Sequence, residues 1–258
     1  MLKELYDYRE LLLTSTKKAI RGKYKASFLG VLWSFINPLL QILVYAIVFP
    51  YLMRNTVDNY LIYLVTGIIP WNFFMTVILE CVSCIKNNSG LIKKVYFPRI
   101  ILPLSCALSG LFNFLVSCII IIFFCLIWKI GISWVIIFVP IVAIIQTILS
   151  LGIGLILGAL DAYIQDLEYI TGFIIQLAMY GTPIIYSLDQ FASSTSILIT
   201  LVKLNPLTTL MNSYRAIFLY HQIPGIQSLM CVAIFSILLL VLGIFVFKKL
   251  EKGFAEQF

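Results

Sequence analysis

Long apolar runs separated by short polar gaps dominate this chain of 258 residues. A helix needs roughly 20 apolar residues to cross ~30 Å of hydrocarbon, and six runs reach about that length. Backbone groups in lipid must be hydrogen-bonded within the chain, so these runs should be helices. We therefore predict an all-α integral membrane protein with six transmembrane helices, at residues 34–53, 60–83, 100–128, 133–160, 170–186 and 226–247.

Shorter apolar segments should lie at the membrane faces. In residues 1–33, leucines recur at helical spacing and most charges fall elsewhere, as in an amphipathic helix lying in the cytoplasmic interface. Residues 197–204 and 207–219 are too short to cross, so we expect re-entrant or interfacial outer helices. Pro206 and Pro224 should break the backbone there. The chain is then one transmembrane domain, 1–258, with spans within 34–247 and a cytoplasmic tail at 248–258.

The basic residues set the orientation. With the amino terminus inside and six crossings, 14 of the 18 Lys and Arg residues fall in inside segments and 4 fall outside. Cytoplasmic segments of membrane proteins carry such an excess, so both termini are predicted to be cytoplasmic. Attraction to anionic lipid explains the net charge of +7, and no nucleic-acid partner is needed.

The sequence lacks signs of its own energy source or catalytic site. It holds a single His, His221, and no Walker A, HExxH or GxSxG motif. No predicted span carries a central acid–base pair of the kind that proton-coupled carriers use. The CxxC of Cys81 and Cys84 has no second CxxC or His beside it, so small buried thiols are the better interpretation. Transport against a gradient would therefore need a partner that supplies energy.

The inner loop at residues 86–99 reads KNNSGLIKKVYFPR. Anchoring at the inner face explains its Lys residues but not an apolar cluster in a cytoplasmic loop. Such a cluster needs a protein surface to cover it. We predict a docking loop made of Lys86, Leu91, Ile92, Lys93, Lys94, Val95, Tyr96 and Phe97.

Acidic residues near the inner face are candidates for salt bridges. The connection DAYIQDLE at residues 161–168 holds three acids and no base. Glu80 lies near the inner end of the second run, where an acid is costly unless paired. We expect it to pair with Lys86 or an amino-terminal base, and proton transport is the alternative. The candidates are Glu80, Asp161, Asp166 and Glu168.

Small residues recur four apart in the fourth run, at Ser150, Gly154 and Gly158. Such a stripe lets two helices approach closely. The partner helix could belong to the same chain or to a second copy.

Five segments resemble one family, the ABC type-2 permeases that export O-antigen, capsule and teichoic-acid polymers. Residues 23–40 (KYKASFLGVLWSFINPLL) resemble the entry to the first span, and residues 91–105 (LIKKVYFPRIILPLS) resemble the inner loop before the third. Residues 181–186 (GTPIIY) are similar to the end of the fifth span, and residues 204–219 (LNPLTTLMNSYRAIFL) to an outer NP…R segment. The tail at 250–258 also fits, and all five keep the family order.

The resemblance implies a transport subunit, not an enzyme, in a bacterial inner or plasma membrane. It implies a homodimer bound to two copies of a separate ATP-binding cassette subunit, which would hold the ATP and Mg; this chain would hold no cofactor. The cargo would be a lipid-linked polysaccharide on undecaprenyl diphosphate, or a teichoic acid, moved to the outer face. The family usually has Arg-Asp where this chain has Gln165 and Asp166, so a salt bridge from that Arg is in doubt.

The resemblance also implies roles for residues. The docking loop would be the coupling helix that receives the ATPase stroke. Lys23, Lys25 and Arg99 would bind the lipid diphosphate by charge-assisted hydrogen bonds, with the amino-terminal helix as a gate. Tyrosine offers an apolar face and a hydroxyl, which suits stacking on sugar rings, although interfacial belts also use it. The glycan path would be lined by Tyr45, Tyr51, Tyr180, Tyr186 and Tyr214.

Two other functions stay open from the sequence. One is an ABC type-2 permease for a drug or lipid. The other is a membrane-embedded enzyme of envelope lipid metabolism, for which Asp161, Asp166 and Glu168 are the candidate residues.

Overall fold

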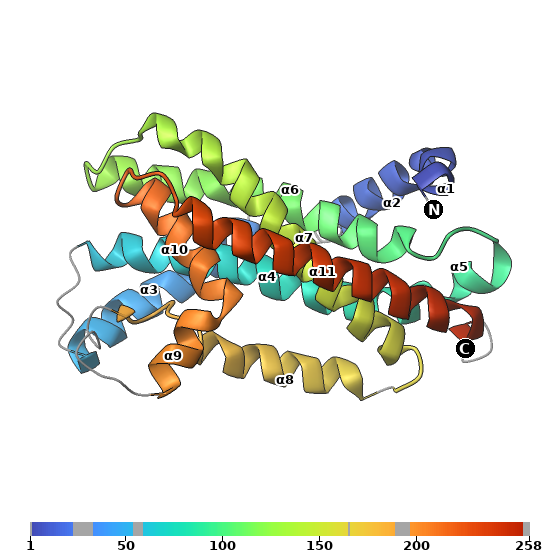
Figure 1. Cartoon of the computed structure of the whole chain (residues 1–258). Coiled ribbons are helices and arrows are strands. Elements are labelled where there is room, and N and C mark those ends of the chain that lie inside the picture. Colours follow the sequence, from blue (N-terminus) through green and yellow to red (C-terminus); the bar gives the residue numbers. More distant parts are fainter. Residues whose placement is uncertain (1, 23–32, 54–58, 165, 189–196, 255–258) are drawn as a thin grey trace.

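The computed structural model describes residues 2–22, 33–53, 59–164, 166–188 and 197–254. Every regular element in those ranges is helical, which confirms the all-α prediction (Figure 1). The elements are α1 (Leu2–Asp7), α2 (Arg9–Gly22), α3 (Trp33–Met53), α4 (Tyr60–Asn87), α5 (Ser89–Lys94), α6 (Ile101–Ile127), η2 (Trp134–Phe138), α7 (Val139–Asp161), α8 (Leu167–Tyr180), α9 (Ile197–Leu204), α10 (Pro206–Phe218), α11 (Ile226–Leu250) and η4 (Glu251–Gly253).

Four helical segments are long and apolar enough to cross a membrane. They are α4, α6, α7 with the short 3₁₀ helix η2 before it, and α11 with η4 after it. They match the second, third, fourth and sixth predicted runs. A multi-pass membrane protein is therefore confirmed.

The other two predicted spans are also helical, and α3 has 21 residues. The run at 34–53 forms α3, whose described apolar stretch is Ile36–Phe49. The run at 170–186 forms α8, which has 14 residues and ends at Tyr180. At 1.5 Å per residue α8 covers ~21 Å, less than the thickness of the hydrocarbon. Among the described residues, length and composition together therefore support four of the six predicted spans.

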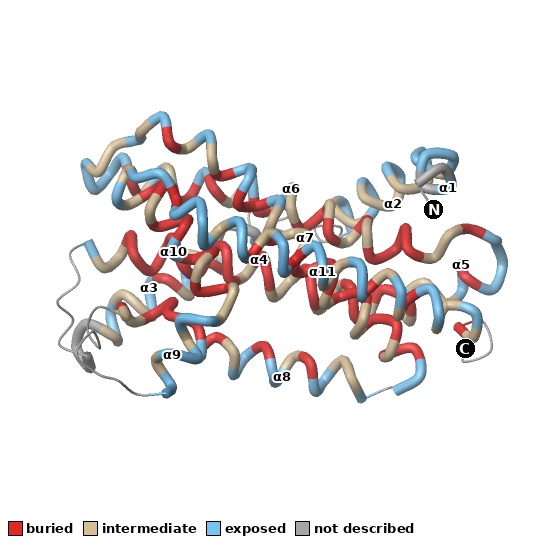
Figure 2. Tube along the Cα trace, in the orientation of Figure 1, coloured by how far each residue is buried: buried red, intermediate tan, exposed pale blue. Residues whose placement is uncertain are grey.

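Helix α4 forms the centre of the bundle. Of its most apolar stretch, 78% is buried, against 17% for the corresponding stretch of α11. Figure 2 shows the difference: buried residues follow α4, whereas α11 presents a largely exposed face. Since lipid is itself apolar, the exposed face of α11 suits contact with a bilayer.

A buried polar network links three helices inside the bundle. Gln146 of α7 donates from Nε2 to the Pro70 carbonyl oxygen of α4, at 2.8 Å. The Oε1 of Gln146 accepts a hydrogen bond from the Tyr214 hydroxyl of α10, at 2.9 Å. Both the nitrogen and the oxygen of the amide therefore have a hydrogen-bond partner, as polar groups buried in an apolar interior require.

Glycines bring α7 close to two neighbours. A Cβ added to Gly154 would lie 2.5 Å from the Cys81 Cβ, and one added to Gly158 would lie 2.5 Å from the Cys81 carbonyl oxygen. Toward α11, a Cβ on Gly243 would lie 2.6 Å from the Gly152 carbonyl oxygen. The small-residue stripe of the fourth run therefore packs helices within this chain.

The described ends of the chain lie at one end of the bundle, which we call the terminal end (right in Figure 1). The predicted amino-terminal helix is present as α1 and α2, and α2 packs along α6. Backbone hydrogen bonds from Tyr8 to Glu4 (3.0 Å) and from Leu12 to Tyr8 (3.1 Å) carry the helix through the turn between α1 and α2.

The opposite end holds α9 and α10 (left in Figure 1). Pro206 separates them, as predicted, and begins α10. The Asn205 side chain caps α10 by accepting the Leu207 backbone N–H at 3.0 Å, which satisfies one of the free donors of the first turn. Helix α10 is mostly buried and packs against α4, α7 and α11. It is an internal part of the bundle.

Candidate functional site

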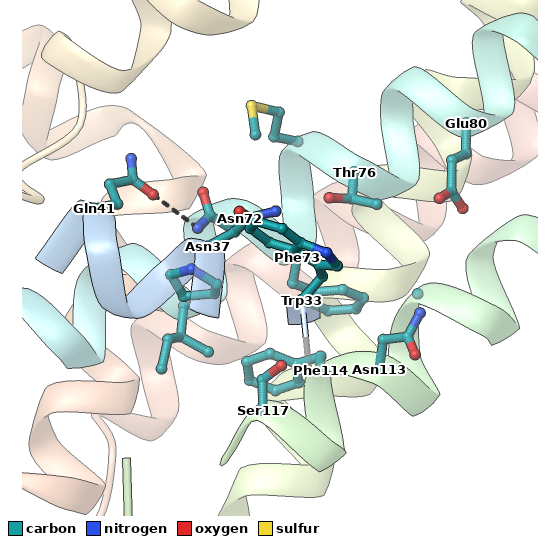
Figure 3. Close-up of a pocket in the computed structure, with 14 residues that line it drawn as sticks. Trp33, Asn37, Gln41, Asn72, Phe73, Thr76, Glu80, Asn113, Phe114 and Ser117 are labelled. Carbon is teal, nitrogen blue, oxygen red and sulfur yellow. Dashed lines mark hydrogen bonds between the residues drawn. The ribbon is translucent and has the colours of Figure 1, made fainter. Parts of the chain in front are cut away.

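A cavity of about 500 Å³ lies between α3, α4 and α6 (Figure 3). Its wall is unusual for helices of this apolarity because half of its lining side chains are polar. We call it the polar groove and define it by Asn37, Gln41, Asn72, Thr76, Glu80, Asn113 and Ser117.

Helical spacing explains how these side chains meet. Residues four apart lie on the same face of a helix, one turn above the other. Each of the three helices carries such a set, and Figure 3 shows the labelled side chains converging on one space. The pairs or triplets are Asn37 and Gln41 on α3; Asn72, Thr76 and Glu80 on α4; and Asn113 and Ser117 on α6.

One hydrogen bond ties two walls of the groove together. Asn72 donates from Nδ2 to the Gln41 Oε1 at 3.0 Å, joining α4 to α3. A carboxamide has two donor hydrogens and an acceptor oxygen, so each side chain keeps further bonding capacity. The groove can therefore hydrogen-bond a ligand without losing this contact.

Aromatic rings form the rest of the wall. Phe73 and Phe114 stack with ring centroids 4.7 Å apart, and Phe114 meets the Tyr214 ring edge-on at 5.4 Å. Trp33, at the start of α3, lines the same cavity and is 41% exposed. The groove thus combines aromatic faces with amides and hydroxyls.

Of the seven polar residues of the groove, only Glu80 was predicted from the sequence as a candidate site residue. A signal was present: amides and hydroxyls four residues apart inside three apolar runs. Polar side chains at membrane depth are costly and line cavities or pathways more often than lipid-facing surfaces. The groove is therefore the strongest candidate for a functional site in the described part of the chain.

The predicted docking loop lies at the terminal end. Lys86 belongs to the last turn of α4, and the following residues form the short helix α5 and an extended stretch after it. Ile92 and Phe97 are buried, whereas Tyr96 is 92% exposed. The remaining members are exposed as well: Leu91, Lys93, Lys94 and Val95.

The predicted acids gather mostly at the junction of α7 and α8. Lys86 forms an ion pair with Glu168, with 3.9 Å between nitrogen and oxygen. Asp161 accepts the Glu168 backbone N–H at 3.1 Å, while Asp166 is exposed at the start of α8. Lys86, one expected partner of Glu80, is thus held by Glu168, and Glu80 lines the polar groove.

A second cavity, about 310 Å³, lies at the terminal end beside the docking loop. Arg99 lines it and donates to the Glu251 carbonyl oxygen, and its guanidinium lies 5.8 Å from the centre of the Phe254 ring. Lys248 and Lys252 line the same cavity. The other two predicted diphosphate ligands, Lys23 and Lys25, lie outside the described residues.

Of the five tyrosines predicted for a glycan path, the four whose side chains are described lie in different surroundings. Tyr214 is fully buried, and Tyr45 packs edge-on against Phe49 with centroids 5.4 Å apart. Tyr180 is exposed, and its carbonyl oxygen accepts the Tyr186 hydroxyl at 3.1 Å. The side chain of Tyr51 lies outside the described set. Their role in a path stays a prediction.

Metal binding is not supported by the described part of the chain, where no group of three or more His, Cys, Asp or Glu could hold an ion. Cys81 and Cys84 of the CxxC are buried. Cys81 packs against Gly154 and donates to the Pro103 carbonyl oxygen at 3.4 Å. These thiols therefore serve helix packing.

Known proteins match the chain over nearly its whole length. The model of the ABC-2 type transporter family matches residues 10–219. The O-antigen export system permease protein RfbA of Myxococcus xanthus is 33% identical over 259 residues, covering 100% of this chain and 98% of that protein. Two proteins of the same name from Klebsiella pneumoniae are each 33% identical over 249 residues, covering 96% of this chain and 94% of theirs. All three are named as permeases of an export system.

Proposed function

Because the chain belongs to the ABC-2 type transporter family and is a transport subunit rather than an enzyme, we propose that it exports a lipid-linked cell-surface polysaccharide. In this proposal the cargo is a glycan on undecaprenyl diphosphate, moved from the cytoplasmic to the outer face. The relatives named for O-antigen export support this choice of cargo.

The polar groove is the observation that carries the proposal. Its amides and hydroxyls lie on α4 and α6, two of the helices long enough to span the membrane, and on α3 beside them. Seven polar side chains gathered around one cavity would be costly on a surface that faces lipid. They suit a water-filled passage for sugars, because the hydroxyls and aromatic faces of the wall match the polar edges and apolar faces of sugar rings.

The proposed assembly is a homodimer with two copies of an ATP-binding cassette subunit, and ATP and Mg act on that subunit. The docking loop supports this arrangement, since its exposed Tyr96, Val95 and basic residues form a surface that a partner can cover. The terminal end would then face the cytoplasm of a bacterial inner or plasma membrane. Both termini and the docking loop would lie on that side.

The proposed topology keeps six crossings. In it α3 and α8 complete the set begun by the four longer helices, and α9 and α10 lie at the outer face. At the inner face Arg99 would bind the diphosphate, together with Lys23 and Lys25. Arg99 is supported by its position at the cavity of the terminal end, which Lys248 and Lys252 also line together with Glu4 and Glu251.

A drug or lipid permease is less well supported by the groove. An apolar cargo gains little from a wall of carboxamides, because each amide would lose water without a replacement hydrogen bond. Two of the three acids that an enzyme could use are engaged in structural contacts, Asp161 with the Glu168 backbone and Glu168 with Lys86, and the third, Asp166, is exposed.

The test replaces two groove residues in the native cell. We expect Asn72→Leu with Thr76→Val to lower the amount of surface glycan and to raise the amount of lipid-linked glycan inside, with normal insertion. Gln176→Leu, which removes an exposed amide of α8 outside the groove, is the matched control and should export normally. Unchanged surface glycan after depletion of the whole protein would remove the proposed function.

A further inference from the structure

The residues that follow α11 are packed into the terminal end of the bundle. Phe254, directly after η4, is fully buried, and its ring meets the Phe247 ring edge-on with centroids 5.4 Å apart. A buried ring holds its segment firmly in place, because removing it would leave a cavity in the packed interior. Residues 250–254, which we call the tail segment, are therefore a fixed part of the bundle.

The tail segment is bound by a residue at the end of the docking loop. Arg99, two residues after Phe97, donates from its guanidinium to the Glu251 carbonyl oxygen. The same guanidinium lies 5.8 Å from the centre of the Phe254 ring, within the range of a cation–π interaction. Since Phe97 is itself buried, movement of the docking loop would also move Arg99 and, through it, the tail segment.

The tail segment is also bound by the connection between α7 and α8, residues 161–168. Tyr163 of this connection donates its hydroxyl to the Leu250 carbonyl oxygen at 2.8 Å, and its ring centre lies 6.2 Å from that of Phe254. A Cβ added to Gly253 would clash with the Tyr163 hydroxyl. The close approach of Tyr163 to the tail segment therefore needs a glycine at that position.

A second link joins the docking loop to the same connection. Lys86, at the start of the loop, pairs with Glu168 at 3.9 Å, and the two side chains are 41% and 40% exposed. An ion pair this long and this exposed contributes little, because water screens it and both side chains lose freedom. The tail segment has a buried ring that contacts both partners, so it is the stronger of the two links.

We propose that the tail segment transmits movement of the docking loop to the connection between α7 and α8, with Phe254 as the positioning residue. The inference rests on the proposed function, in which an ATP-binding subunit moves the docking loop. Chains of packed side chains can carry such coupling between two sites. Arg99 and Tyr163 act through one shared ring, and α8, which follows the connection, receives the movement.

The first experiment measures backbone hydrogen exchange in the complex with the ATP-binding subunit, in lipid nanodiscs. A non-hydrolysable ATP analogue should change the exchange of residues 86–99 and 161–168 in the parent. In Phe254→Leu, which keeps an apolar side chain but loses the ring, the change in 86–99 should remain and the change in 161–168 should fall about threefold or more. A full response of residues 161–168 in this variant, or no response in the parent, would overturn the inference.

Two control variants separate coupling from stability. Phe245→Leu makes the same substitution at an exposed position of α11, and Phe218→Leu makes it at a buried position of α10, at the opposite end of the bundle. In both, residues 161–168 should respond to the analogue as in the parent. If Phe218→Leu weakened the response as much as Phe254→Leu, general loss of stability would explain the effect and the inference would fail.

The second experiment measures export by the same variants in the native cell. Phe254→Leu should lower surface glycan about threefold or more, while the ATP-binding subunit still copurifies and hydrolyses ATP. Normal export by this variant overturns the inference. The proposed function has a separate readout: unchanged surface glycan after depletion of the whole protein removes the glycan cargo, whereas the exchange measurement tests the inference with the nucleotide analogue alone.

Discussion

At the scale of single residues, Arg215 holds the opposite end of the bundle together. Its guanidinium is buried, donates to the Ile184 carbonyl oxygen at 3.0 Å and lies 3.5 Å from the centre of the Tyr63 ring. A longer contact reaches the Asn212 Oδ1 at 3.4 Å. Guanidinium is planar and weakly hydrated, so it tolerates stacking and burial better than an ammonium group. One side chain thus joins α10, α4 and the turn after α8.

Replacing Arg215 should loosen this end. We expect Arg215→Leu to lower the free energy of unfolding by about 2–4 kcal/mol, because the Ile184 carbonyl would remain buried without its donor. Thermal unfolding in mild detergent measures the effect. Lys203→Leu, on an exposed position of α9, should leave the melting temperature unchanged. An Arg215→Leu protein as stable as the parent would show that the guanidinium contacts are not stabilising.

Glycine packing gives a second prediction at this scale. We expect Gly158→Ala to destabilise the chain by about 1–3 kcal/mol, since the new Cβ would meet the Cys81 carbonyl oxygen and force α7 away from α4. Gly172→Ala is the matched control, because its Cβ would meet Leu79 at an ordinary 4.0 Å. That control should be neutral or slightly stabilising, as alanine is the better helix former. Equal stability of both variants would contradict the close α4–α7 contact.

The groove shows how far single residues can be interpreted before folding. Glu80 was recognisable because a carboxylate in an apolar run is costly wherever it lies. Asn37, Asn72 and Asn113 were not recognisable as site residues, because a single amide in a long apolar run can form its hydrogen bonds with nearby groups of its own helix. Their shared cavity depends on how α3, α4 and α6 pack, which the periodicity of each separate run does not determine.

At the scale of elements, the docking loop divides its apolar residues between two tasks. Ile92 and Phe97 are buried and hold the segment to the bundle. Leu91, Val95 and Tyr96 are exposed and available to another protein. The sequence predicted the cluster but not this division, because α5 is too short for a clear helical face.

Substitutions of the exposed and of the buried residues of the docking loop should therefore have different effects. Tyr96→Ala with Lys93→Glu and Lys94→Glu should reduce copurification of the ATP-binding subunit about tenfold or more without lowering the melting temperature. Phe97→Ala should lower the melting temperature, since burial of a Phe side chain contributes about 3–5 kcal/mol. Copurification in mild detergent and thermal unfolding give the two readouts.

Tyr169→Ala controls for loss of an exposed aromatic ring, because Tyr169 lies on α8 and is 77% exposed. Its copurification should equal that of the parent. If the triple variant still retained the ATP-binding subunit, the coupling role of the loop would be wrong.

Helix ends were harder to predict than helices. The fifth apolar run continues past Tyr180, but the helix does not, because Pro183 lacks a backbone donor and the Thr182 hydroxyl bonds the Ala178 carbonyl at 2.9 Å. Ile184 and Ile185 keep the run apolar while they are buried in turns. The apolar run therefore extends beyond the end of α8, because the residues that follow the helix are buried as well.

At the scale of the whole molecule, the proposed orientation has a direct test. With six crossings, Asn59→Cys should react with a membrane-impermeant maleimide on intact cells, and Asn87→Cys and Asp166→Cys only after permeabilisation. Cells that express the parent chain give the background. Labelling of Asp166→Cys from outside would show that α8 does not cross as proposed.

The four longer helices and the arrangement of both termini at one end followed from run lengths and charge. The position of α10 did not. Its sequence is moderately apolar with Arg215, Asn212 and Ser213 among its polar residues, a pattern that resembles a surface helix. Only the packed bundle supplies the partners, Tyr63 and Ile184, that allow the arginine to be buried.

The exposed face of α11 makes the protein responsive to bilayer thickness. Only 17% of the most apolar stretch of α11 is buried, so one face of the helix is free to meet lipid, while the other packs along α7 and approaches it closely where Gly243 faces Gly152. A helix whose hydrophobic length differs from the hydrocarbon thickness can tilt to remove the mismatch. Because α11 packs along α7, such a tilt would move the two helices together, and the lipid composition of the host membrane would help to determine the working shape of this transporter.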